Sequence, residues 1–228
     1  IDAFANIVTE FHANEAAVDL MRHRSYSEKG IMDFLFVSLF QWAKEKNAVI
    51  CGSLAVEENG QYYNRLIWVQ PSGEILTYDK RHLFSLSNEQ EQYTAGEQRL
   101  IVEYKGWKIC PLICYDLRFP VWSRNTEQYD LLLYVANWPE RRNYAWQSLL
   151  IARAIENQCY VAAVNRVGKD AHDITHSGDT MVVDAVGVVL QHAEYMQAVV
   201  YATLDKSELL KMRSALPFLK DGDVFEIK

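Results

Sequence analysis

The sequence predicts an α/β protein in which two β-sheets are covered by helices. Apolar runs typical of buried strands alternate with segments whose apolar residues recur at helical spacing. Several neighbouring strands are joined by short turns, which indicates hairpins and argues against a simple doubly wound parallel sheet. Half of the 228 residues are hydrophobic, so a sizeable core is expected. We therefore expect a single domain over residues 1–228.

In the first half of the chain, one helix precedes a run of short strands. Asn59-Gly60 is typical of a tight hairpin turn, and Pro71-Ser72-Gly73 supplies a second turn. The expected elements are a helix over 33–46 and strands over 48–56, 62–70 and 74–78.

In the second half, Lys105-Gly106 predicts a hairpin turn between strands over 100–104 and 107–113. The run 131–135 is apolar throughout, as in a strand buried on both faces. Further strands are expected over 131–135, 160–165, 181–184, 188–191 and 198–204, and helices over 144–157 and 206–213.

Composition excludes several classes of function. The net charge is −7 without a basic stripe, which argues against nucleic-acid binding. No apolar run approaches the roughly 18–20 residues of a membrane span. The four cysteines form no C-x-x-C pair and no zinc-finger spacing with histidine, so we expect reduced thiols, no metal site and a cytoplasmic protein.

Two segments place a reactive residue at the end of an apolar strand. Cys114 follows the strand that ends at Ile113, a position that commonly presents a nucleophile. A buried cysteine is more often a small core residue. However, Asp116 and Arg118 follow at once, and both are costly to bury unless paired. We therefore expect this loop to border a pocket or an ion pair.

Lys80 lies at the end of another expected strand. Most lysines are solvated, and spacing alone does not bring Lys80 to Cys114. If both side chains share a pocket, the ammonium charge would lower the pKa of the thiol and stabilise an oxyanion.

The segments Tyr78-Asp79-Lys80-Arg81-His82-Leu83-Phe84 and Cys114-Tyr115-Asp116-Leu117-Arg118-Phe119-Pro120 resemble the lysine and cysteine motifs of the nitrilase superfamily. The likeness extends from about Val49 to Lys228 and is greatest to the bacterial omega-amidase-like branch. Further matching segments follow in the family's order at 134–139, 146–158, 160–168, 178–187 and 213–217.

The resemblance implies a four-layer α-β-β-α sandwich, a homodimer formed through one helical layer, and no metal or organic cofactor. It also implies hydrolysis of a small-molecule carboxamide to acid and ammonia through a Cys114 thioester, as in omega-amidases acting on 2-oxoglutaramate or 2-oxosuccinamate. The alternatives are a deaminated glutathione amidase, a carbamoylase, or a non-catalytic interaction domain if the general base is lost.

The resemblance also assigns roles near the nucleophile. Lys80 and the backbone N–H of Tyr115 would bind the oxyanion. Glu89 would orient the lysine and the nucleophile, unless it is a solvated loop acid. Asn137 and Trp138 would be pocket walls, although a buried tryptophan is more often core.

Arg118 has two possible roles under the same resemblance. Its guanidinium could hold a substrate carboxylate, or it could form an ion pair within its own loop. We favour the structural role, because the family keeps this arginine for substrates that lack a carboxylate.

The general base is the weakest part of the resemblance. The family's base is a glutamate in a Pro-Glu-Met-Phe-like strand, and no such motif is found here. Glu10, in the segment Asn6-Ile7-Val8-Thr9-Glu10-Phe11, follows an apolar lead-in and is the candidate. Glu15 has better spacing but lacks a preceding strand. The N-terminal region could be incomplete, divergent or without a base. We favour incompleteness, because the chain begins with Ile1.

Overall fold

A computed structural model describes residues 3–9, 16–23 and 31–227. The chain divides into two compact units. The first contains Ile1–Gly52, Ile67–Thr77 and Gln197–Val199, and the second contains Ser53–Leu66, Tyr78–Met196 and Val200–Lys228. The prediction of one domain over residues 1–228 stays a prediction.

The first unit contains an antiparallel strand pair and one helix. Strand β1 (Ala3–Thr9) pairs with β2 (Ala16–His23), and α1 (Ile31–Glu45) contacts both strands. Beyond the helix end, Asn47 adopts a left-handed φ of 53° and the N–H of Ala48 donates to the carbonyl of Ala43. This capping arrangement ends the helix, close to the position predicted from the sequence.

A three-stranded sheet follows, in the order β3 (Ile50–Glu58), β4 (Gln61–Val69) and β5 (Ile75–Asp79). Asn59 and Gly60 both have positive φ values, 55° and 77°, as a two-residue hairpin turn requires. The predicted hairpin is therefore confirmed. Because β5 ends at Asp79, the next residue, Lys80, stands at the exit of a strand.

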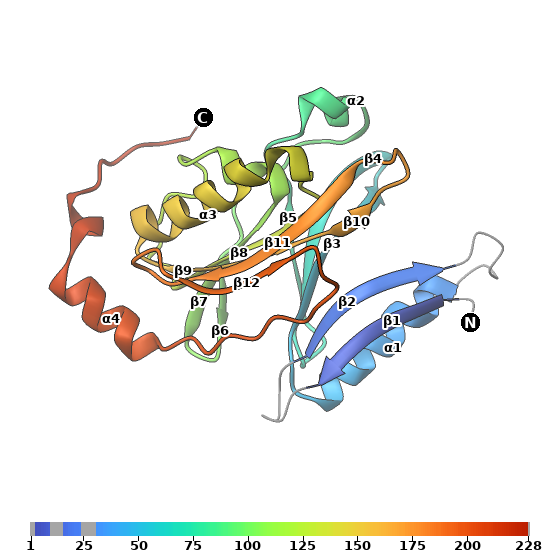
Figure 1. The fold of residues 1–228 in the computed structure, drawn as a ribbon, viewed down its shortest axis with the longest axis horizontal. Helices are drawn as coiled ribbons and strands as arrows, with labels where there is room; N and C mark the ends of the chain where they lie inside the picture. Colours follow the sequence, from blue (N-terminus) through green and yellow to red (C-terminus); the bar gives the residue numbers. More distant parts are fainter. Residues whose placement is uncertain (1–2, 10–15, 24–30, 228) are drawn as a thin grey trace. The chain divides into compact units, whose positions relative to one another are not determined.

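A seven-stranded sheet dominates the second unit (Figure 1). Its path runs β10-β11-β9-β8-β7-β6, and β12 also pairs with β11. The central strands β7, β8 and β9 are parallel, and their neighbours are antiparallel. The strands are β6 (Val102–Tyr104), β7 (Trp107–Ile113), β8 (Leu131–Ala136), β9 (Tyr160–Asn165), β10 (Val167–Lys169), β11 (Thr175–Val183) and β12 (Val189–Glu194).

The parallel pairing of β7 with β8 fixes one edge of the site. Ile113 of β7 lies opposite Val135 of β8. Because both strands run in the same direction, the residues after them leave the sheet at the same edge. Cys114 follows β7 and Asn137 follows β8, so the two residues are brought together by strand register.

Helix α3 (Asn143–Asn157) packs against β9 and β11 (Figure 1). Its residues Trp146, Leu150 and Ala154 are fully buried and recur at four-residue spacing, which places them on one face. Helix α4 (Lys206–Ala215) is capped by Asp205, whose carboxylate accepts from the N–H groups of the first turn.

The expected strand over 198–204 is not formed. No secondary structure is assigned there, and β12 ends at Glu194. An alternating apolar pattern does not itself supply a hydrogen-bonded neighbour, which a strand needs. In the described ranges, no helix combines the length and apolar character needed to cross a lipid bilayer.

Candidate active site

The cysteine loop, Cys114–Arg118, leaves the sheet through a sharp turn. Cys114 is partly exposed and has a φ of 44°, a left-handed value that is strained for a residue other than glycine. The loop continues as a short 3₁₀ helix. The guanidinium of Arg153, on α3, donates to the carbonyl of Leu117 at 2.6 Å. The loop is thus held from the helix as well as from the sheet.

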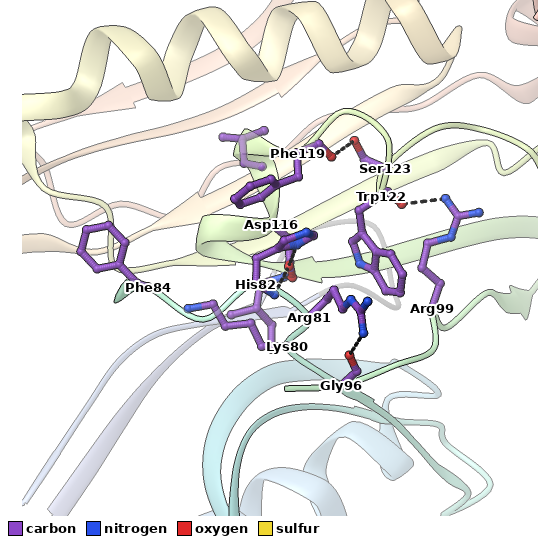
Figure 2. A network of polar contacts seen from close by, with 12 residues as sticks. Lys80, Arg81, His82, Phe84, Gly96, Arg99, Asp116, Phe119, Trp122 and Ser123 are labelled. Atoms are coloured by element: carbon purple, nitrogen blue, oxygen red, sulfur yellow. Dashed lines mark hydrogen bonds and ion pairs between the residues drawn. The ribbon is translucent and has the colours of Figure 1, made fainter. Parts of the chain in front are cut away.

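Asp116 connects the cysteine loop to the end of β5. Its side chain is fully buried and accepts hydrogen bonds from the N–H of Ile113 (3.1 Å), the hydroxyl of Tyr78 (2.7 Å) and the N–H of His82 (3.0 Å). The imidazole Nδ1 of His82 lies 2.8 Å from the same carboxylate, and Figure 2 shows the two side chains facing each other. Because one buried carboxylate accepts hydrogen bonds from both segments, it fixes the cysteine loop relative to the residues at the end of β5.

The lysine loop, Lys80–Phe84, carries a buried ammonium. Lys80 is 4 % exposed, and its Nζ lies 2.6 Å from Oε2 of Glu89. The same oxygen accepts from the backbone N–H of Phe84 (2.6 Å), and Oε1 accepts from Asn64 Nδ2 (3.0 Å). Glu89 is therefore not a solvated loop acid.

The environment keeps Glu89 ionised. Burial alone would raise the pKa of its carboxyl group, but the charge of Lys80 and the hydrogen bonds from Lys80, Asn64 and Phe84 hold that pKa below its ordinary value. The pair is thus a carboxylate and an ammonium in direct contact. A buried pair of this kind needs the additional donors to offset its desolvation.

Opposing effects act on the thiol of Cys114. Burial raises its pKa above the ordinary 9.0, while the charge of Lys80 and the backbone N–H of Asn137 act in the opposite direction. We expected Lys80 to lower the pKa of the thiol. The lysine acts in that direction, but desolvation is the larger effect. The thiol is therefore mainly protonated near neutral pH.

The segment after β8 is held by Trp138 and Asn165. The backbone N–H of Trp138 donates to Asn165 Oδ1 at 2.7 Å, and its indole Nε1 donates to the carbonyl of Arg142 at 2.8 Å. Trp138 is 3 % exposed, with its ring 5.5 Å from that of Trp146. Trp138 is thus a core residue as well as a neighbour of the site, whereas Asn137 is exposed.

Arg118 contacts an aromatic ring. Its Cζ lies 4.8 Å from the ring centroid of Trp138, and the described residues provide no carboxylate within ion-pair distance of it. The loop ion pair that we expected is not formed, because Asp116, the acid of the same loop, points inward to Tyr78 and His82. Arg118 makes a cation–π contact instead.

Aromatic rings fill the space between the two loops. The ring of Tyr115 lies 4.9 Å from Phe84 and 5.1 Å from Phe119, and Phe119 stacks on His82 at 3.8 Å. The guanidinium of Arg142 covers Phe84, with 5.1 Å from Cζ to the centroid.

Sequence reasoning overlooked several of these contributors. They are Asn64, Tyr78, His82 and Arg142. Tyr78 and His82 belong to the quoted lysine motif and Arg142 follows the Asn137-Trp138 segment, but their contacts depend on folding. Glu10 lies outside the described residues.

The site joins the cysteine loop to a loop that carries a buried lysine–glutamate pair, and comparison with known proteins gives the class of protein to which the chain belongs. Residues 31–214 match the family model described as Carbon-nitrogen hydrolase. The chain is 48% identical over 186 residues to "Omega-amidase YafV" of Escherichia coli K12, covering 81% of this chain and 73% of that protein. It is 39% identical over 176 residues to "2-oxoglutaramate amidase" of Bacillus subtilis, covering 76% and 68%.

Among solved structures, a CN-hydrolase superfamily protein from Xanthomonas campestris has a TM-score of 0.83 and 42% identity, covering 90% of this chain and 83% of that chain. The chain belongs to the carbon–nitrogen hydrolase family, in the omega-amidase-like branch of the nitrilase superfamily. The predicted family is thereby confirmed, as is the predicted α-β-β-α fold class. The family and the omega-amidase relatives also confirm the predicted enzyme acting on carbon–nitrogen bonds.

A second similarity concerns the N-terminal region. Residues 1–55 match a model described as Phosphatidylglycerol lysyltransferase, C-terminal. This match covers a minor part of the chain and does not assign the chain to that family. It lies where the resemblance to the nitrilase superfamily is weakest, the region that contains Glu10 and Glu15.

Proposed function

We propose that the protein is an omega-amidase that hydrolyses the terminal carboxamide of a small dicarboxylic acid monoamide, such as 2-oxoglutaramate or 2-oxosuccinamate. The observation that carries this proposal is that the buried carboxylate of Asp116 joins the loop of the buried Lys80–Glu89 pair to the loop that begins at Cys114, where β7 leaves the sheet. The names of the Escherichia coli and Bacillus subtilis relatives support the substrate class.

In the proposed reaction, a base removes the proton of Cys114 and the sulfur attacks the amide carbonyl. Lys80 and the backbone N–H of Tyr115 bind the oxyanion that forms. The intermediate collapses, the amide nitrogen takes up a proton and leaves as ammonia, and a thioester remains on Cys114. Water then cleaves the thioester, releasing the acid and returning a proton to sulfur.

Glu89 acts in this scheme through Lys80. Its carboxylate accepts hydrogen bonds from the ammonium of Lys80 and from the backbone N–H of Phe84. Glu89 therefore holds the lysine side chain in position. Because its pKa is lowered, Glu89 is a weak proton acceptor and is poorly suited to deprotonate a thiol whose pKa is raised.

The general base is therefore assigned elsewhere, and we propose Glu10. The matched test is Glu10→Gln beside Glu15→Gln. Glu10→Gln should lower kcat by at least about 100-fold, within the range of general-base catalysis, while Glu15→Gln keeps turnover. Full activity in the Glu10 variant would remove this assignment.

The function itself is tested by ammonia release from a panel of amides. The panel contains 2-oxoglutaramate, 2-oxosuccinamate, an N-carbamoyl amino acid and deaminated glutathione. We expect turnover of the first two, and loss of that turnover in Cys114→Ala with an unchanged unfolding transition. Turnover confined to the carbamoyl compound or to deaminated glutathione would replace the omega-amidase assignment.

We also propose a cofactor-free, cytoplasmic homodimer. All four cysteines are free, which supports a reducing compartment. Light scattering after size exclusion gives the oligomeric state, and activity after exhaustive chelation tests the absence of a metal requirement. A monomer would contradict the proposed homodimer. Activity that is lost on chelation and restored by a metal would contradict the proposed absence of a metal cofactor.

A further inference from the structure

Two guanidinium groups near the catalytic cysteine face aromatic rings without a protein carboxylate. Arg118 lies over Trp138 and Arg142 lies over Phe84. Within the part of the chain that the structure describes, neither side chain donates a hydrogen bond or forms an ion pair. Arginine near a protein interior is normally paired. Two such groups beside one site indicate that an anion completes the arrangement.

Arg142 is placed by contacts that lead directly to the reacting groups. It ends a 3₁₀ helix, Glu140–Arg142, and its carbonyl is fixed by the indole of Trp138. Its guanidinium covers the ring of Phe84, whose N–H donates to Glu89, the partner of Lys80. The same ring contacts Tyr115, the residue after Cys114. Arg142 therefore covers the residue of the lysine loop that contacts the cysteine loop.

The electrostatic surroundings of Arg142 favour a negatively charged ligand. Burial lowers its pKa, and the positive charges of Arg141 and Arg118 lower it further, whereas Cys114 and Tyr115 act in the opposite direction. An anion bound there would relieve the repulsion between the guanidiniums and replace part of the lost hydration.

We propose that Arg142 binds the free carboxylate of the substrate and thereby selects monoamides of dicarboxylic acids over neutral amides. Its planar guanidinium suits a carboxylate, which it can hold through two parallel hydrogen bonds. Arg118, whose guanidinium lies over the ring of Trp138, adds further positive charge. This inference rests on the proposed omega-amidase function, because it assigns the end of the substrate that does not react.

The test compares two amides of similar length, 2-oxoglutaramate and its methyl ester, in the wild type and in Arg142→Gln, Arg142→Lys and Arg141→Gln. Arg141 is the matched control, because it is the neighbouring arginine and is exposed. Arg142→Gln should raise KM for the anionic amide by roughly 10- to 100-fold, the range for a lost hydrogen bond to a charged group. The kcat of Arg142→Gln should change little. Its KM for the ester should stay within about twofold of the wild-type value, because the ester has no carboxylate for Arg142 to bind.

Arg142→Lys keeps the charge but not the planar fork, so its KM for the anionic amide should fall between those of the wild type and the glutamine variant. Arg141→Gln should match the wild type with both substrates. Equal losses on both amides in Arg142→Gln, or the same KM change in Arg141→Gln, would overturn the assignment of Arg142.

Failure of the inference can be told apart from failure of the proposed function. If the wild type hydrolyses 2-oxoglutaramate and the Arg142 variants keep its KM, only the carboxylate site is wrong. If the wild type hydrolyses neither 2-oxoglutaramate nor 2-oxosuccinamate but cleaves another amide of the panel, the proposed function fails, and the inference fails with it.

Discussion

Two carboxylates accept hydrogen bonds from the lysine loop, and their surroundings differ. Asp116 is fully buried and accepts from a tyrosine hydroxyl, two backbone N–H groups and the imidazole of His82. Glu89 keeps 11% of its side chain exposed and contacts the ammonium of Lys80 directly. One carboxylate is held mainly by neutral donors, the other by a charge.

The difference indicates that the two carboxylates have different roles, one structural and one electrostatic. Asp116 connects the ends of β5 and β7, so it determines where the cysteine and lysine loops lie. Glu89 sets the position and electrostatic surroundings of Lys80 within that frame. Removing Asp116 should therefore reduce the free energy of unfolding, changes at Lys80 should act mainly on the chemistry, and changes at Glu89 should alter how stability depends on pH.

The largest expected effect is on stability, in Asp116→Ala. The substitution leaves the Tyr78 hydroxyl and the N–H groups of Ile113 and His82 without their buried acceptor. We expect the free energy of unfolding to fall by about 3–5 kcal/mol, as when one partner of a buried polar network is removed. Urea denaturation monitored by tryptophan fluorescence measures this change.

The matched control is Asp173→Ala. Asp173 pairs with Lys169 at the surface, and its side chain is 80% exposed. Removing an exposed ion pair changes stability little. If both variants lost the same stability, the structural role of Asp116 would be wrong.

Lys80→Met tests the charged side of the comparison. Removing the ammonium takes away an oxyanion donor, and we expect kcat to fall by about 100- to 1000-fold. The same change removes the positive charge that opposes the rise in the pKa of Cys114. The pH midpoint of Cys114 alkylation by iodoacetamide, followed by mass spectrometry, should therefore move upward.

Two comparisons sharpen the alkylation experiment. Lys211→Met, at an exposed surface pair, should leave both the midpoint and kcat unchanged. In the wild type, Cys114 should react before Cys51 and Cys110, because burial raises the pKa of each of these two to about 12. Equal labelling of all three would contradict activation of Cys114 by Lys80.

Glu89→Gln should show its effect through pH. The folded-state pKa of Glu89 lies below its ordinary value of 4.5, so the ionised carboxylate stabilises the fold above about pH 4.5 and this contribution is lost as pH falls through the lower folded-state value. The stability difference between wild type and Glu89→Gln should therefore shrink between pH 6 and roughly pH 3. Urea midpoints across this range measure it.

The control for Glu89→Gln is Glu91→Gln, an exposed acid of the same short helix, α2 (Glu89–Gln92). Its difference from the wild type should be small and should not follow the same pH course. A stability difference in Glu89→Gln that is constant with pH would mean that the ionised pair with Lys80 does not stabilise the fold.

Much of the fold could be predicted from local sequence. Asn59-Gly60 and the glycine of Lys105-Gly106 mark hairpins because asparagine and glycine tolerate positive φ. Apolar runs predict the buried parallel strands β7, β8 and β9. The expected strand over 198–204 was wrong, because pairing with a neighbouring strand cannot be predicted from apolar alternation alone.

The site was less predictable than the fold. Cys114 and Lys80 could be proposed from the sequence because each lies in a contiguous motif. The acceptor role of Asp116 required knowing that β5 and β7 end side by side, and the rise in the pKa of Cys114 depends on burial that no spacing shows. The contact of Arg142 with Phe84 could not be predicted from the sequence, because it joins residues far apart in the chain.

The smallest expected effect is that of Tyr78→Phe, which removes one donor from Asp116 and leaves the other donors in place. The hydroxyl of Tyr78 also accepts from Trp122 Nε1 at 2.9 Å and from the N–H of Arg81 at 3.2 Å. We expect a loss of about 1–2 kcal/mol in the free energy of unfolding. Because Lys80 and Glu89 keep their contact, kcat should fall much less than in Lys80→Met. A kcat as low as that of Lys80→Met would show that the structural and electrostatic roles are not separable.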